Sequence, residues 1–154
     1  MPTIETRLAA LGVTLPDAPA PAANYVPFVH VGNQVYISGQ ISRDALGGLI
    51  IGKLGETMDV TQGAQAAKTC AIALLAQLKA ACDGDLGRVV RAVKLVGFVN
   101  STPDFVDQPK VINGASDFLV AALGEIGRHA RSAVSAVALP LGVAVEIEAI
   151  FEVR

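Results

Sequence analysis

An arginine inside an almost wholly apolar segment has the clearest chemical potential of any residue in this sequence. Residues 129–142 read HARSAVSAVALPLG, and no acidic residue within the segment neutralises Arg131. A charge beside a buried strand costs free energy unless it is paired. Arg131 therefore pairs either with an acidic residue of its own chain, which is the commoner case, or with an anion that the protein binds.

Two glutamates follow this segment in a stretch that alternates like a half-buried strand. In residues 144–153, AVEIEAIFEV, the side chains of Val145, Ile147 and Phe151 share one face. Glu146 and Glu148 share the opposite face, because successive side chains of a strand point to opposite sides. Glu146 is thus a candidate either for an ordinary ion pair with an arginine on a neighbouring strand or for a role in a site.

Each of several other residues can be explained by a structural role as well as by a functional one. Tyr25 is typical of a residue that packs an extended arm on a domain, and Ser38, Gly39 and Gln40 are typical of a strand end with a tight turn. Asn113 fits the exposed side of a helix, and His129 fits a solvent-exposed loop. No Ser-His-Asp set, P-loop or metal-ligand spacing is present, so we expect no metal and no cofactor.

The elements that must position these residues follow from the periodicity of the apolar side chains. Asp59 and Gln62 form a capping-box pair, which predicts a helix that runs to Asp83 and Gly84. A second helix is expected after Asp107, with Pro109 tolerated in its first turn. The expected strands are a hairpin around residues 32–33 and the segments 88–100, 131–138 and 144–153. A short helix over 3–12, an extended arm within 15–24, and a loop over 43–58 with at most one short strand complete the chain.

This order of elements predicts one α+β domain over residues 1–154, with one mixed β-sheet and two helices on one face. The other face of the sheet would carry Glu146 and Glu148 among small residues. That face is too apolar for open water and too charged for a core. We therefore expect a subunit interface with a wet cleft at its edge, and Arg131 near that cleft at the start of a neighbouring strand.

The composition narrows the class of protein. Apolar residues make up 52% of the 154 residues and charged residues 17%, a balance that favours assembly with identical subunits. A net charge of −2 gives no field that would attract nucleic acid or an anionic membrane. No apolar stretch is long enough to span a membrane, and we expect no secretory signal. Cys70 and Cys82 lie too far apart on one helix for a disulfide, so reduced thiols and a cytoplasmic location are expected.

Several segments together resemble the RidA family, also called the YjgF or L-PSP endoribonuclease-like family. The stretch NYVPFVHVGNQVYISGQI (24–41) is similar to its opening hairpin, and VNSTPDF (99–105) is similar to the junction before its second helix. ARSAVSAVALPLGVAVEIEAI (130–150) is the most specific match. The resemblance covers roughly residues 20–154, and Ala133 departs from it because many members carry a cysteine there.

The resemblance implies a chorismate-mutase-like fold, a homotrimer with sites between subunits, and hydrolysis of reactive 2-imino or enamino acids to 2-oxo acids and ammonia. Arg131 would bind the substrate carboxylate with two hydrogen bonds, and Glu146 would assist the attacking water. The alternative is a module that binds small carboxylates without turnover; an endoribonuclease is a third option, which the charge disfavours. The remaining implied site residues are Tyr25, Ser38, Gly39, Asn113 and Ala133.

Overall fold

The computed structural model describes residues 1–21 and 23–154, so Ala22 of the predicted arm lies outside the described residues. Short 3-10 turns follow α2, α3 and β4. The order of helices and strands agrees with the one expected from the sequence, apart from the optional strand within 43–58. Along the chain the elements are α1 (Ile4–Ala10), β1 (Phe28–Val31), β2 (Gln34–Ile41), α2 (Val60–Ala81), β3 (Val89–Asn100), α3 (Gln108–Leu123), β4 (Ala130–Ala136) and β5 (Val145–Val153).

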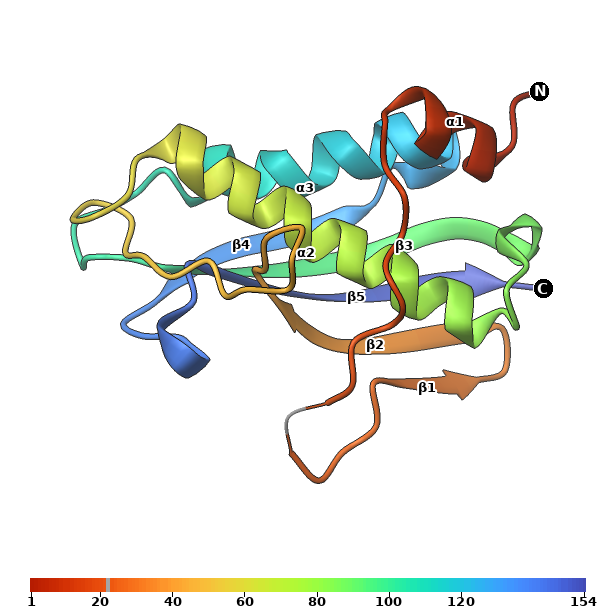
Figure 1. The fold of residues 1–154 in the computed structure, drawn as a ribbon, viewed down its shortest axis with the longest axis horizontal. Helices are drawn as coiled ribbons and strands as arrows, with labels where there is room; N and C mark the ends of the chain where they lie inside the picture. The colour runs from red at the N-terminus through yellow and green to blue at the C-terminus, as the bar shows by residue number, and fades with distance from the viewer. Residues whose placement is uncertain (22) are drawn as a thin grey trace.

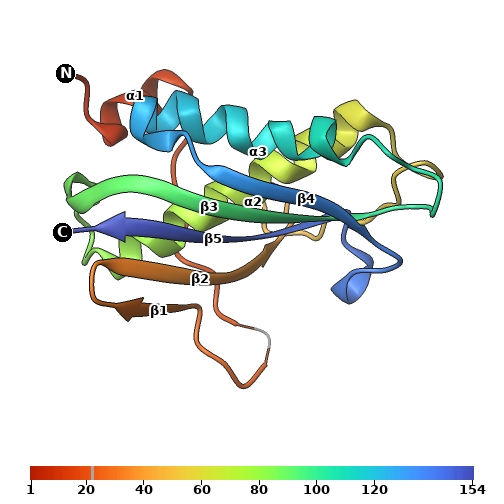
Figure 2. The same ribbon diagram turned by 180° about the vertical axis from the view of Figure 1, so that it is seen from behind.

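The five strands form one mixed sheet in the order β1-β2-β5-β3-β4. All neighbouring pairs are antiparallel except β3 and β4, which are parallel and are joined by α3. Helices α2 and α3 lie side by side over one face of the sheet, and α1 lies against the end of α3 (Figures 1 and 2). We call this side the helix face and the opposite side the outer face. The predicted α+β fold, with two helices on one face, is confirmed.

The predicted distribution of the β5 side chains between the two faces of the sheet is also confirmed. Val145, Ile147 and Phe151 are fully buried under the helices, whereas Glu146 is only partly covered and Glu148 is exposed. The helix α2 begins as expected, because the Asp59 carboxylate accepts from the Gln62 backbone and the Gln62 side chain accepts from the Asp59 backbone. Periodicity and capping chemistry therefore predicted these elements correctly.

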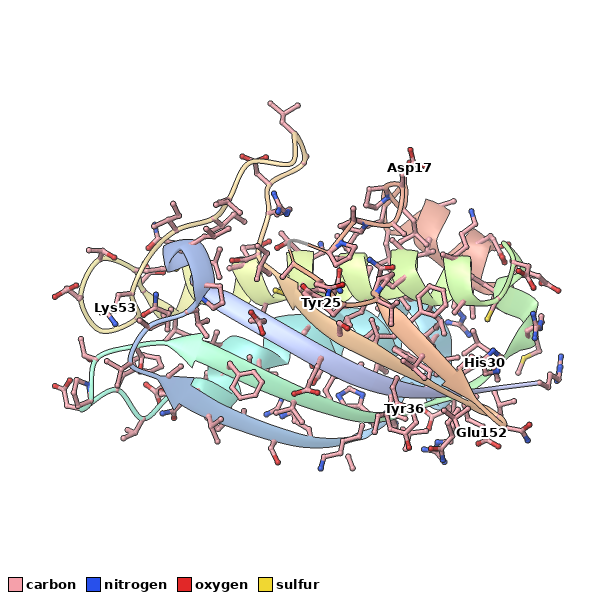
Figure 3. The ribbon with its side chains drawn as sticks, turned by 90° about the horizontal axis from the view of Figure 1, so that it is seen from below. Asp17, Tyr25, His30, Tyr36, Lys53 and Glu152 are labelled. Carbon is pink, nitrogen blue, oxygen red and sulfur yellow. The ribbon has the colours of Figure 1, made fainter. Side chains whose placement is uncertain are left out.

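The segment between β2 and α2 contains isolated bridges and no strand of its own. Arg43 bridges Leu49, and Ile51 bridges Val143. Further along, the ammonium of Lys53 donates to the Asn100 side chain (2.7 Å) and to the Val137 carbonyl, which ties this loop to the ends of β3 and β4 (Figure 3). Isolated backbone bridges and the contacts of Lys53 thus hold this segment, in which the sequence allowed at most one short strand.

The two long helices approach each other closely at Gly114. A Cβ at this position would collide with the backbone of Ala64 in α2, 2.6 Å from its carbonyl carbon, and a helix backbone cannot yield as a flexible side chain can. A side chain here would therefore push the helices apart.

We expect Gly114→Ala to destabilise the protein even though alanine is the better helix former. The propensity gain of about 0.5–1 kcal/mol is outweighed by an overpacking cost of about 1–3 kcal/mol or more. Thermal unfolding checks this, and Asp117→Ala at an exposed position of α3 is the control. An unchanged or higher melting temperature for Gly114→Ala would contradict the close approach.

The outer face of the sheet carries exposed apolar side chains among charged ones. Val29, Tyr36 and Val134 each leave close to half of their surface exposed, at 48%, 45% and 45%. Figure 3 shows Tyr36 and Glu152 on this side, away from the helices. Among the described residues, no helix combines the length and the apolar character that a membrane span requires.

Candidate functional site

The side chain of Arg131 lies on the helix face, at the open edge of the sheet. In the parallel β3–β4 pair it stands opposite Leu95, which is fully buried in the core, and paired residues share a face. Its guanidinium passes under the start of α3. Nη1 donates to Asn113 Oδ1 (2.9 Å) and to Ser116 Oγ (3.1 Å), and Nη2 donates to the Pro109 carbonyl (3.3 Å).

All three acceptors of Arg131 are neutral. The ion pairs within the described residues join Arg88 to Asp83, Lys110 to Asp107 and Arg128 to Glu125, and none of them includes Arg131. The ordinary reading, in which Arg131 pairs with a glutamate of its own chain, is therefore wrong for the described part of the chain. The guanidinium is held in place with its charge uncompensated, which suits the binding of an anion.

His129 and Ser116 extend the support behind Arg131. His129 Nδ1 donates to the Gly127 carbonyl (2.6 Å), so in the neutral ring Nε2 accepts from Ser116 Oγ (2.9 Å), while Ser116 Oγ accepts from Arg131. His129 lies in a loop as expected, but the expected solvent exposure was wrong, because His129 is half-buried and hydrogen-bonded at both nitrogens. The sequence carried no signal for Ser116 beyond its spacing of three residues from Asn113 on α3.

If Arg131 binds a small carboxylate such as pyruvate, Ser116→Ala should weaken this binding about five- to tenfold. One hydrogen bond that positions a charged group is worth roughly 1–1.4 kcal/mol. Titration calorimetry measures the affinity, with Asp117→Ala on the same helix as the control. Unchanged affinity in Ser116→Ala would mean that Asn113 and Pro109 position the guanidinium without Ser116.

Glu146 lies on the outer face, opposite Phe98 of β3 and Ile41 of β2. It is half-buried, and its burial, with a smaller contribution from the charge of Glu148, raises the pKa of the Glu146 carboxyl above its usual range. Gly39 lies directly against the carboxylate, so that a Cβ on residue 39 would collide with it. A half-buried carboxyl group with a raised pKa is a candidate for proton transfer.

An irregularity in β2 brings Gly39 to Glu146. The pairing register shifts between Ile37 and Gln40, which marks a β-bulge at Ser38 and Gly39. The bulge is anchored on both sides: Ser38 N donates to the Pro27 carbonyl (2.9 Å), Ser38 Oγ donates to the Val26 carbonyl (2.8 Å), and Gln40 Nε2 donates to the Ser38 carbonyl (2.8 Å). The predicted tight turn is thus a bulge inside a strand.

Tyr25, Gly39 and Glu146 border one cavity of about 1130 Å³. The arm forms one wall of this cavity, α2 forms another, and the loop after β2 closes a third side. Tyr25, directly after the arm, is half-exposed at the border of the cavity, and its packing of the arm on the domain stays a prediction. These contacts join the arm, the bulge and Glu146 into one group.

The candidate residues therefore form two groups that one chain does not bring together. Arg131 and Ala133, with Asn113 from α3, lie on the helix face at the β4 edge, and Glu146 lies on the outer face with Tyr25, Ser38 and Gly39 nearby. The strand β3 separates β4 from β5, which corrects the expectation that Arg131 lies on the strand next to that of Glu146. A joint site of these two groups requires a second copy of the chain.

The fold and these two groups define a class of protein: a small α+β domain that presents an arginine on one face of its sheet and a half-buried glutamate on the other. The chain belongs to the family described as "YjgF/chorismate_mutase-like, putative endoribonuclease", whose model matches residues 5–152.

Individual relatives agree with this assignment. The chain is 48% identical to Protein TCP17 of Trypanosoma cruzi, over 98% of this chain and 94% of that protein. The crystal structure of Atu1372 from Agrobacterium tumefaciens, a protein of unknown function, is 49% identical with a TM-score of 0.91 over 98% of this chain and 92% of that one. RidA from the Antarctic bacterium Psychrobacter sp. PAMC 21119 is 31% identical with a TM-score of 0.60 over 89% of this chain and 94% of that one.

Proposed function

We propose that the protein hydrolyses reactive 2-imino or enamino acids to 2-oxo acids and ammonia. The observation that carries this proposal is the guanidinium of Arg131, which three neutral acceptors hold in place without an acidic partner in the described chain. Its planar fork can bind a carboxylate with two parallel hydrogen bonds. The membership of a family that includes a protein named RidA adds to this support.

The proposed reaction needs positioning more than chemical activation. Arg131 of one subunit binds the substrate carboxylate and thereby fixes the imine carbon near Glu146 of the neighbouring subunit. The ionised Glu146 accepts a proton from a water molecule as its oxygen bonds to the imine carbon. Glu146 returns this proton to the nitrogen, which gives a carbinolamine. The proton of its hydroxyl group then also moves to the nitrogen by way of Glu146, the carbon–nitrogen bond breaks as the carbonyl forms, and ammonia and the 2-oxo acid leave. No metal or cofactor takes part in this scheme.

A homotrimer with sites between subunits accounts for the separation of the two groups. A head-to-tail contact that closes after three copies places the helix-face edge of one subunit against the Glu146 group of the next. The apolar side chains exposed on the outer face would be covered in such an assembly. A stable monomer of about 16 kDa in sedimentation at micromolar concentration would remove this joint site.

A binding module without turnover is the second candidate. In this alternative Arg131 holds a small carboxylate without turnover, and Ala133, two residues further on, supplies no functional group beside it. Endoribonuclease activity, which the family description suggests, fits less well because the net charge of −2 provides no attraction for RNA. The buried free cysteines Cys70 and Cys82 agree with a reducing compartment such as the cytoplasm.

A coupled assay tests the enzyme against the binding module. An amino-acid oxidase generates imino acids in the presence of the protein, and the decay of the imine is followed by trapping with semicarbazide. The proposal expects decay faster than in buffer for at least one imine. No acceleration across several amino acids, together with measurable binding of 2-oxo acids, would favour the binding module.

Mixing two inactive variants tests whether the site is shared between subunits. Arg131→Ala and Glu146→Gln each disable one half of every site in their own homotrimer. Random co-assembly in equal amounts would rebuild about a quarter of the sites with both native residues, because each site draws its halves from two neighbours. Recovery of about a quarter of the native activity is expected, and no recovery after confirmed subunit exchange would contradict the shared site.

A further inference from the structure

The cavity beside Glu146 is far larger than a three-carbon imino acid needs. Its volume is about 1130 Å³, whereas cavities of about 300–1000 Å³ already accommodate drug-sized ligands. A substrate with a methyl side chain would leave most of this space unfilled. The cavity is continuous with the proposed site because Tyr25, Gly39 and Glu146 line it.

The wall formed by the arm is held in place by the core. Leu8, at the end of the chain's first helix, is buried, and Val13 and Leu15 pack against the core cluster. Further along, the buried amide of Gln77 in α2 donates to the Pro19 carbonyl (2.7 Å) and, at 3.4 Å, to Gln40 beside the bulge. Gln40 in turn donates to the Ser38 carbonyl in the bulge. One network of hydrogen bonds therefore holds both the arm and the bulge, so the cavity is formed before any ligand enters.

The charged residues around the cavity are either committed to local structure or placed at its rim. Arg43 donates to the Gly47 carbonyl (2.9 Å), and Asp44 accepts from the backbones of Leu46 (2.9 Å) and Gly48 (2.8 Å). Asp17 is exposed, and Figure 3 shows it on the arm at the outside of the molecule.

The walls between this rim and Glu146 are mainly apolar. Val13, Pro16, Ile41, Ile72, Ala73 and Leu141 contribute to them. An apolar wall favours an apolar ligand group, because burial of such a group removes both surfaces from water.

We infer that the protein acts on 2-imino acids with a bulky apolar side chain, of the branched aliphatic or aromatic kind, and that this side chain occupies the cavity between the arm and α2. The inference rests on the proposed function, because it takes Glu146 as the position of the imine carbon. The substrate carboxylate then points out of the cavity toward the interface, where Arg131 of the neighbouring subunit would meet it. The side chain points inward, between Ile72 and the arm.

Comparison of imines of different size tests the inference on the native protein. A D-amino-acid oxidase supplies the imines from D-alanine, D-leucine and D-phenylalanine. The reacting carbon of these imines is no longer a stereocentre, so D-amino acids give the same imines as L-amino acids. We expect kcat/KM for the leucine- and phenylalanine-derived imines to exceed that for the alanine-derived imine by about tenfold or more, as apolar pockets discriminate by side-chain size. An equal or higher value for the alanine-derived imine overturns the inference and leaves the proposed function intact.

A substitution in the cavity wall tests whether this cavity determines the preference between imines. Ala73→Leu extends a larger side chain from α2 into the cavity and should lower the ratio of leucine-imine to alanine-imine hydrolysis several-fold. Ala80→Leu makes the same chemical change at an exposed position of α2 and should leave the ratio unchanged. If Ala73→Leu leaves the ratio at the native value, the side chain does not lie in this cavity.

Binding of stable 2-oxo acids separates failure of the inference from failure of the proposed function. Titration with 4-methyl-2-oxopentanoate, phenylpyruvate and pyruvate requires no turnover. Tighter binding of the two larger acids, lost in Ala73→Leu, would support the cavity as the side-chain site even if no imine is hydrolysed. Tighter binding of pyruvate, or no binding of any of the three, overturns the inference.

Discussion

Replacement of Arg131 by lysine is expected to impair imine hydrolysis almost as severely as replacement by alanine. An ammonium group cannot reproduce the two parallel hydrogen bonds that a guanidinium makes to a carboxylate. It also cannot reach Asn113, Ser116 and Pro109 at the same time in the geometry that now fixes the group. Loss of such a charge-assisted pair costs about 2–5 kcal/mol, which corresponds to roughly a thirty- to several-thousand-fold fall in kcat/KM.

The same variants distinguish a ligand-binding arginine from a structural one. Because the partners of Arg131 are neutral and lie at the edge of the sheet, its removal should change the melting temperature little. Arg128→Ala, which breaks only an exposed ion pair with Glu125, is the matched control and should retain activity. Folded, trimeric Arg131 variants with full activity would end the proposal, and a large loss of stability would indicate a structural role.

Local patterns were sufficient to predict the elements and their faces. The alternation along residues 145–153 assigned Glu146 and Phe151 to opposite sides of the sheet, because a strand has a period of two. The capping pair at Asp59 and the proline in the first turn of α3 located both long helices, because each satisfies or avoids a free backbone amide. These signals depend on neighbours in the sequence and not on the tertiary structure.

The relation between the two charged candidates could not be predicted in the same way. Which strands become neighbours in the sheet depends on long-range contacts that the spacing of residues does not encode. The crossover through α3 makes β4 parallel to β3 and inserts β3 between Arg131 and Glu146. A strand, a connecting helix and a second strand is the usual signature of a parallel pair, so the direction of β4 relative to β3 is predictable from the order of the elements, whereas the position of β3 between Arg131 and Glu146 is not.

The same limit applies to His129. Its hydrogen-bond partner Ser116 lies thirteen residues earlier on α3, and no sequence pattern linked the two residues. Their contact follows from the way α3 packs over the edge strand, and this packing is also what brings Asn113 to Arg131. The residues that support a catalytic group are thus harder to predict than the group itself, because they act through tertiary packing.

Replacement of Glu146 by glutamine is expected to lower activity and raise stability together. Glutamine preserves the shape of the side chain but cannot accept the proton of the attacking water, so kcat should fall about a hundred- to ten-thousand-fold. The raised pKa of Glu146 means that its ionised form is less favourable in the folded chain than in the unfolded one. Removal of that charge should therefore increase the melting temperature at neutral pH.

The raised pKa of Glu146 determines how stability and activity should change with pH. A carboxyl group with a raised pKa in the folded state costs no stability below its unfolded pKa, near 4.5, and costs progressively more as the pH rises through its folded value. The melting temperatures of the native protein and Glu146→Gln should therefore converge in acid and diverge toward neutral pH. The kcat/KM of the native protein should rise with pH through the raised pKa as Glu146 becomes the base. Glu56→Gln, at an exposed position of the loop before α2, controls for the loss of one negative charge. If Glu146→Gln keeps native activity, or is less stable than the native protein at pH 7, Glu146 is a structural residue and not the base of the reaction.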